Sequence, residues 1–263
     1  MEENKKFKLV TSKKTRYLLP NILTLAGVCL GISSIKFSID GNYTLAVTLI
    51  LFAAILDALD GRIARMIKGT SEFGKELDSL TDFVSFGIAP VFILYFWELK
   101  TYGKLGWAIT LIYSVCCVLR LARFNLTKID EKQKWKNNFF EGVPSPAGGL
   151  LILMPLIYEL ADFNLRIDIK YFTPYLTIAV AILLVSKVPT LALKKISISP
   201  KATVFLLLTI GIVFISLLFY TLETLLVFGI GYIISIPMSI YFYNKQNKEN
   251  LQKISDEDHE DIL

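Results

Sequence analysis

The chain carries, in its first third, the stretch Asp57-Ala-Leu-Asp60-Gly61-Arg-Ile-Ala64-Arg65, followed after eight residues by Gly74-Lys-Glu-Leu-Asp78-Ser-Leu-Thr-Asp82. Apolar sequence of membrane-spanning length borders it on both sides. Carboxylates lose hydration near lipid at high cost, so four of them there suggest a function. Asp57 and Asp60 are three residues apart and share a helix face, while Asp78 and Asp82 repeat at four residues along another. Two helices joined by a short turn would therefore aim all four carboxylates at one point.

Apolar blocks make up most of the remaining chain. Of its 263 residues, 54% are hydrophobic, and they are gathered rather than dispersed as in soluble domains. A helix crossing the hydrocarbon core needs about 20 residues, and open strands are excluded there because each backbone polar group needs an internal partner. The sequence predicts an all-α, polytopic membrane helical bundle of about eight transmembrane helices, at residues 20–39, 43–66, 80–97, 105–123, 146–160, 173–187, 204–221 and 222–243.

One membrane domain, residues 20–243, is expected between a basic cytoplasmic arm at 1–19 and a tail at 244–263. No signal-peptide pattern precedes the first span, so we expect that span to be retained. The arm fits an interfacial helix on the membrane, and a solvated determinant of topology would look the same. The acidic tail, which holds the single histidine His259, is typical of a disordered end. Gly27 and Gly31 form a GxxxG pattern that allows close helix packing.

Basic residues divide unevenly between the connections of the predicted bundle. With the N-terminus in the cytoplasm, most of the 28 Lys and Arg residues fall on the inner side, and the outer loops hold only Lys100, Lys104, Arg166 and Lys170. This positive-inside pattern predicts an integral protein of the cytoplasmic (inner) membrane, with both termini and the acidic stretch on the cytoplasmic side. The net charge of +5 then fits anionic headgroups or phosphates rather than nucleic acid.

The residue types of the acidic stretch point to phosphoryl chemistry. Hard carboxylate oxygens in this number favour Mg²⁺, Mn²⁺ or Ca²⁺ over Zn²⁺, and two such ions about 3.5–4 Å apart can clamp a phosphoryl group. Gly61 and Gly74 remove side chains where a phosphate or nucleotide would approach the backbone. Arg65, one turn beyond Gly61, offers a bidentate phosphate contact. Since His259 lies in the tail, the carboxylates are the expected general bases.

The stretch resembles the signature of the CDP-alcohol phosphotransferase family and matches every defined position of Asp57-x-x-Asp60-Gly61-x-x-Ala64-Arg65-x8-Gly74-x3-Asp78-x3-Asp82. The resemblance implies that the four aspartates bind two divalent metal ions (Mg²⁺ or Mn²⁺). It also implies that Asp82 is the catalytic base that deprotonates the acceptor alcohol, and that Gly61, Ala64, Arg65 and Gly74 help to hold the CDP moiety. Members are commonly homodimers, so we expect a homodimer.

Residues 19–24, 79–90, 120–125 and 140–149 resemble the phosphatidylserine synthase branch of that family. This branch joins L-serine to CDP-diacylglycerol. Four residues are candidates for binding serine: Arg120, Arg123, Asn125 and Ser145. The two arginines would share a helix face and grip the carboxylate of serine, although the positive-inside rule alone also predicts basic residues there.

Two roles are open for three polar residues: contact with the substrate or capping of a helix. Ser145 would either contact the substrate or cap the fifth predicted helix. Asn21 and Thr24 lie on one face at the inner end of the first helix, where they would either meet the nucleotide or cap that helix.

The resemblance thus implies a metal-dependent transferase that moves a phosphatidyl group from CDP-diacylglycerol, or an ether-lipid analogue, to the hydroxyl of L-serine with release of CMP. One alternative is another acceptor within the family, such as inositol phosphate or glycerol phosphate. A divalent-cation transporter is a second alternative, although transporter sites usually lie near the membrane midplane within repeated halves, and the sequence shows no repeat.

Overall fold

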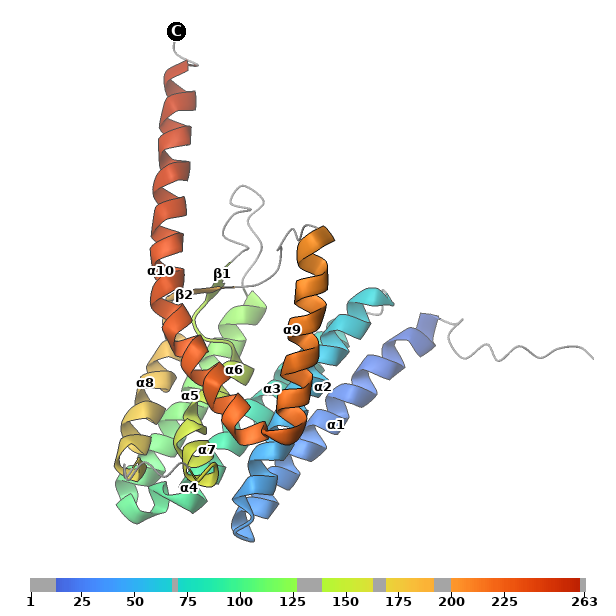
Figure 1. The fold of residues 1–263 in the computed structure, drawn as a ribbon, viewed down its shortest axis with the longest axis vertical. Helices are drawn as coiled ribbons and strands as arrows, with labels where there is room; N and C mark the ends of the chain where they lie inside the picture. Colours follow the sequence, from blue (N-terminus) through green and yellow to red (C-terminus); the bar gives the residue numbers. More distant parts are fainter. Residues whose placement is uncertain (1–12, 68–70, 127–138, 163–168, 192–199, 261–263) are drawn as a thin grey trace, which may run out of the picture.

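The computed structural model describes residues 13–67, 71–126, 139–162, 169–191 and 200–260. Within them the protein is a bundle of helices with one short two-stranded sheet near one end (Figure 1). The elements are α1 (Lys13–Ile39), α2 (Tyr43–Met66), α3 (Glu72–Asp82), the π-helix η1 (Phe83–Ile88), α4 (Ala89–Trp97), η2 (Leu99–Tyr102), α5 (Lys104–Leu126), β1 (Phe139–Glu141), α6 (Ser145–Ile152), α7 (Met154–Leu160), η4 (Lys170–Phe172), α8 (Thr173–Val185), β2 (Pro189–Leu191), α9 (Pro200–Phe219) and α10 (Thr221–Glu260).

Five helical segments in the described residues are long and apolar enough to cross a membrane: Leu18–Ile39, Tyr43–Met66, Glu72–Trp97, Lys104–Leu126 and Thr221–Asn247. The prediction of a polytopic, helical membrane protein is therefore confirmed. Each of the eight predicted spans also contains helix, but three of them give shorter segments. The fifth is divided into α6 and α7, α8 has 13 residues, and α9 contributes the apolar segment Leu207–Phe219. The count of eight crossings stays a prediction.

The third helix begins at Glu72, earlier than the span predicted to begin at residue 80. Ser71 caps it, because its hydroxyl accepts a hydrogen bond from the backbone N–H of Gly74 at 3.0 Å. Such a cap satisfies one of the donors left over at a helix start. Asp78 and Asp82 therefore lie inside a helix that the polar residues before them initiate.

The first helix packs along α2 and also against α3 and η1. At Gly31 the backbones approach so closely that an added Cβ would lie 2.9 Å from Ser85 Oγ and 3.0 Å from Ser85 Cα. One turn earlier, Ser85 donates a hydrogen bond to the carbonyl of Gly27 at 3.2 Å. The GxxxG pattern is thus a close helix contact, as the sequence indicated.

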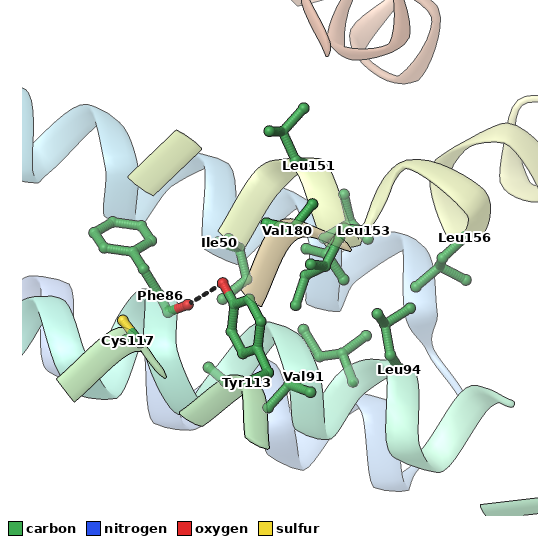
Figure 2. Close-up of a cluster of buried hydrophobic side chains, with 14 of the residues drawn as sticks. Ile50, Phe86, Val91, Leu94, Tyr113, Cys117, Leu151, Leu153, Leu156 and Val180 are labelled. Atoms are coloured by element: carbon green, nitrogen blue, oxygen red, sulfur yellow. Dashed lines mark hydrogen bonds between the residues drawn. The ribbon is translucent and has the colours of Figure 1, made fainter. Parts of the chain in front are cut away.

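The π-helix η1 follows Asp82 directly and lies in the core of the bundle. A π-helix disturbs the regular backbone ladder, and two side chains of α5 bond to its carbonyls. Tyr113 donates to Phe86 O at 3.0 Å (Figure 2), and Ser114 donates to Gly87 O at 3.2 Å. Apolar side chains from α2, α4, α6, α7 and α8 surround this contact, among them Ile50, Leu94, Leu151, Leu156 and Val180 (Figure 2).

The segment before α6 contains an element that the sequence did not predict. Strands β1 and β2 pair antiparallel, with Phe140 opposite Thr190. Gly142 follows with a left-handed φ of +76°, and an added Cβ would lie 2.8 Å from Ser186 O. Only glycine fits this approach to the end of α8. Pro155, which lacks a backbone N–H, lies at the start of α7 and explains the division between α6 and α7.

Near both ends of the chain, the described residues are more helical than the sequence predicted. Residues 13–19 of the predicted arm form the first turns of α1, and the rest of the arm lies outside the described residues. The tail expected to be disordered is helical as far as Glu260. Its sequence has neither Gly nor Pro after Pro237 and is rich in Lys, Glu and Gln, which are good helix formers. Figure 1 shows this part of α10 extending beyond the other helices.

Candidate active site

Three of the signature carboxylates meet between α2 and α3. One oxygen from each of Asp57, Asp60 and Asp78 lies within 4.8 Å of the other two. Asp57 and Asp60 come from one face of α2, and Asp78 comes from the facing side of α3, as the residue spacing predicted. The convergence that the sequence analysis expected is therefore present for these three residues.

The fourth carboxylate joins this cluster through Asp57. The side chains of Asp82 and Asp57 are close neighbours. Asp82 is the last residue of α3, so the π-helix that follows begins immediately beside the cluster. Among the described residues, Asp82 Oδ1 is buried and has no hydrogen-bond partner, whereas Oδ2 accepts a bond from Ser145 Oγ at 2.8 Å.

The first helix supports the cluster from its other side. Thr24 is buried and donates a hydrogen bond to Asp60 Oδ2 at 2.5 Å, while Asn21 lies close enough to Gly74 that a Cβ there would be 3.3 Å from Asn21 Oδ1. The alternative that Asn21 and Thr24 cap the first helix is wrong, because α1 begins at Lys13 and both residues lie inside it. Gly74 therefore admits a polar side chain of α1 beside the acidic site.

Ser145 links the cluster to a buried arginine. Its side chain is 1% exposed and that of Arg120 is 8% exposed. Arg120 Nη1 donates to Ser145 Oγ at 3.0 Å, and the same Oγ donates to Asp82. The alternative that Ser145 caps the fifth helix is also wrong, because the N-cap position of α6 is Pro144 and no side chain caps it.

Arg123 and Asn125, the other predicted serine-binding residues, make different contacts. Arg123 donates to the carbonyls of Val185 and Ser186 at the end of α8, at 2.7 and 3.0 Å. Asn125 Nδ2 donates to Ser79 Oγ at 3.0 Å, beside Asp78. Arg120 is joined to the acidic cluster through Ser145, whereas these two bonds of Arg123 go to the end of α8. The contact of Ser79 with Asn125 was not predicted, because the position of Ser79 in the signature has no defined residue type.

The α2 side of the site has room for a ligand. A Cβ added to Gly61 would meet nothing within 4 Å among the described atoms, so packing within the chain does not explain this glycine. Arg65 is exposed, and its Nε donates to Gly61 O at 2.9 Å. Ala64 is half-buried on the same helix. A small backbone surface with an arginine beside it suits an approaching phosphate.

The donor set fits divalent cations. Asp57, Asp60 and Asp78 supply carboxylate oxygens, which suit Mg²⁺ and Mn²⁺. Asp82 Oδ1 is an additional buried oxygen without a partner in the described residues. Thr24 holds Asp60 by a hydrogen bond, as outer groups commonly orient metal ligands. Clustered carboxylates without nearby cations would repel one another.

A family model described as CDP-alcohol phosphatidyltransferase matches residues 17–185. The chain belongs to this family. The match includes every candidate site residue, from Asn21 to Ser145, and ends at the last residue of α8. In this CDP-alcohol phosphatidyltransferase, α9 and α10 therefore lie outside the part shared with the family model.

The names of similar curated proteins all refer to serine. A CDP-diacylglycerol–serine O-phosphatidyltransferase of Mycobacterium leprae is 36% identical over 85% of this chain and 75% of its own length. One of Helicobacter pylori is 32% identical over 76% of this chain and 82% of its own length. An archaetidylserine synthase of Methanothermobacter thermautotrophicus is 31% identical over 65% of this chain and 68% of its own length. The names differ in the lipid and agree on serine.

Proposed function

We propose that this protein is a CDP-diacylglycerol–serine O-phosphatidyltransferase, which transfers the phosphatidyl group of CDP-diacylglycerol, or of an ether-linked analogue, to L-serine. The convergence of the signature carboxylates at one point carries the proposal. Family membership supports the reaction type, and the names of the relatives support serine as the acceptor. Membership of this family disfavours the cation transporter.

In the proposed reaction the hydroxyl oxygen of serine attacks the lipid-linked phosphorus. The bond from this phosphorus to the CMP oxygen breaks, and CMP leaves. Asp82 takes the hydroxyl proton as general base, and its oxygen Oδ1, which has no hydrogen-bond partner among the described residues, is the atom assigned to that proton. Ser145 occupies the other carboxylate oxygen and so limits the rotation of the side chain.

Two divalent ions, Mg²⁺ or Mn²⁺, would be held by Asp57, Asp60, Asp78 and Asp82. When bound, they supply charge stabilisation to the phosphoryl oxygens and the leaving group. Thr24 contributes by holding Asp60 in one orientation.

The CDP moiety is assigned to the open end of the α2–α3 pair. Gly61, Ala64 and Arg65 would face its phosphates, and the backbone at Gly61 has the space for this approach. Gly74 and Asn21 lie against each other on the opposite side and would form the second wall of this site.

The membrane arrangement follows from the sequence and stays part of the proposal. Eight crossings put both termini and the acidic site on the cytoplasmic side, where soluble L-serine is available. The lipid tails would extend between helices into the bilayer, and two copies of the chain would form a homodimer.

The test is CMP release by the purified protein in lipid nanodiscs. The reaction would contain CDP-diacylglycerol, Mg²⁺ or Mn²⁺, and one acceptor at a time: L-serine, inositol phosphate or glycerol phosphate. We expect release with L-serine and labelled serine in the lipid product. Release with a phosphorylated acceptor and none with serine would replace the proposed acceptor while keeping the family reaction.

A further inference from the structure

The π-helix that follows Asp82 contains a backbone carbonyl with no donor at the usual α-helical position. In an α-helix the carbonyl of Phe86 would accept from the N–H of the residue four positions later. That residue is Pro90, which has no backbone N–H. The hydroxyl of Tyr113 on α5 donates to this carbonyl at 3.0 Å (Figure 2). A side chain from another helix therefore supplies the bond that Pro90 cannot make.

Tyr113 is enclosed between η1 and α6. Its side chain is 0% exposed, and a Cβ added to Gly148 of α6 would lie 3.5 Å from its hydroxyl oxygen. A Cβ added to the next residue, Gly149, would lie 3.2 Å from Phe86 O. The helix that begins with Ser145 thus closes the contact from the other side.

Ser114, the second α5 side chain that bonds to η1, divides its hydroxyl between two carbonyls. Its oxygen lies 3.2 Å from Gly87 O in η1 and 3.0 Å from Thr110 O in its own helix. A hydroxyl has one proton to donate. The bond from Tyr113 to Phe86 is therefore the stronger constraint on η1.

The π-helix determines how α3 is turned relative to α4. Each residue of an α-helix turns the chain by about 100°, and a π-helix takes up an extra residue. Val91 and Leu94 of α4 are fully buried in the core, while Asp78 and Asp82 of α3 lie near Asp57 of α2. If η1 became α-helical and α4 kept its place, α3 would turn by about 100° and carry both aspartates away from α2.

Resting on the proposed function, we infer that Tyr113 is a positioning residue, whose hydroxyl keeps η1 π-helical and thereby directs Asp78 and Asp82 toward the acidic cluster. Ser145 bonds to the carboxylate of Asp82 directly. Tyr113 acts on the same residue through the backbone that follows it and contacts neither the substrate nor the metal ions.

The first experiment compares Y113F with Y43F. Tyr43 also donates to a backbone carbonyl, that of Phe96 at 3.2 Å, near the other end of α4. Each variant keeps the aromatic ring and loses one hydroxyl, so the midpoint of thermal unfolding should fall by about 2–4 °C in both.

Only Y113F should change the reaction. We expect its kcat for CMP release to fall about 10- to 100-fold, because a displacement of reacting groups by about 1 Å has this effect. The Mg²⁺ concentration that gives half-maximal rate should also rise in Y113F and stay unchanged in Y43F, because two proposed metal ligands would turn away. Equal kcat and equal Mg²⁺ dependence in the two variants would overturn the inference.

The second experiment restores a donor to Phe86 without the tyrosine hydroxyl. In P90A/Y113F the alanine supplies an N–H that can bond to Phe86 O in the α-helical register. The unfolding midpoint should return toward the wild-type value while kcat stays low. Recovery of kcat together with the midpoint would show that Phe86 needs only a donor, and it would reject the positioning role. If Y113F alone does not fold, this double variant takes its place beside Y43F.

Wild-type protein separates failure of this inference from failure of the proposed function. If wild-type protein releases CMP with L-serine while Y113F matches Y43F, only the inference fails. If it releases CMP only with another acceptor, the proposed acceptor fails, and the same comparison with that acceptor tests the inference. If it releases CMP with none of the acceptors, the proposed function fails and the inference fails with it.

Discussion

The α2–α3 pair and the α9–α10 pair are both consecutive helices of the bundle, but they differ in what surrounds them. In Glu72–Trp97, which contains α3, half of the most apolar part is buried within the chain, against 17% in Thr221–Asn247 of α10. Large apolar side chains such as Phe214 and Phe228 are exposed on α9 and α10. In a membrane protein such surfaces meet lipid or another chain.

The polar residues of the two pairs differ in the same way. Thr24 and Asp60 join helices 36 residues apart in sequence, and Ser145 and Asp82 are 63 apart. On α9, Thr209 bonds to Phe205 O of its own helix, and Ser216 bonds to Thr224 of α10, which is only eight residues away in sequence. Apolar composition is thus enough for a membrane helix, whereas the acidic site also has polar side chains that meet across helices distant in sequence.

Metal removal should have the largest effect on the α2–α3 site. Treatment with EDTA should reduce serine-dependent CMP release to that of a protein-free blank, because the carboxylates would lose the cations that the reaction requires. Addition of Mg²⁺ or Mn²⁺ in excess should restore it. Full activity in EDTA-treated, metal-analysed protein would rule out the metal role of the cluster.

D82N should lower kcat by about 10²–10⁴-fold, the usual contribution of a general base. The amide keeps the size of the side chain and cannot take the proton. E223Q, the same chemical change at the start of α10, should keep the wild-type rate. The measurement is CMP release at saturating serine and lipid, and near wild-type release by D82N would remove its role as base.

T24V should act through the cluster and have a smaller effect. Loss of the bond to Asp60 should weaken metal activation about 10- to 100-fold, as is typical when a group that orients a metal ligand is removed. T209V on α9 is the matched control and should leave the Mg²⁺ dependence unchanged. The measurement is the Mg²⁺ concentration that gives half-maximal rate. Equal values for T24V and the wild type would show that Thr24 does not orient the site.

G31A should have the smallest of these effects, a decrease in the free energy of unfolding. The new Cβ would meet Ser85 at 2.9–3.0 Å, and such overpacking costs about 1–3 kcal/mol. G211A on α9, where a Cβ meets nothing within 4 Å, should be neutral or gain up to about 1 kcal/mol from helix propensity. Thermal unfolding in one detergent compares the two. Equal shifts would mean that the α1 contact is not tight.

The sequence predicted the helical membrane fold and the convergence of the acidic residues because both depend on local spacing. Membrane length and helical periodicity are properties of short segments, and Asp57, Asp60 and Asp78 are close in the chain. The two strands, the division at Pro155 and the helical tail were not predicted. Each depends on contacts or on a balance of propensities that no fixed motif encodes.

The contacts of Ser145, Arg120 and Arg123 could not be predicted from local sequence. By sequence alone the two arginines were equivalent, three residues apart and both basic. Only the tertiary structure separates them, because Arg120 meets Ser145 at the start of α6 while Arg123 meets the end of α8. The sequence by itself determined that the apolar blocks form membrane helices and that Asp57, Asp60 and Asp78 meet between α2 and α3. Which polar side chains complete the site depends on how distant helices pack, since a hydrogen bond requires its two atoms within about 3 Å.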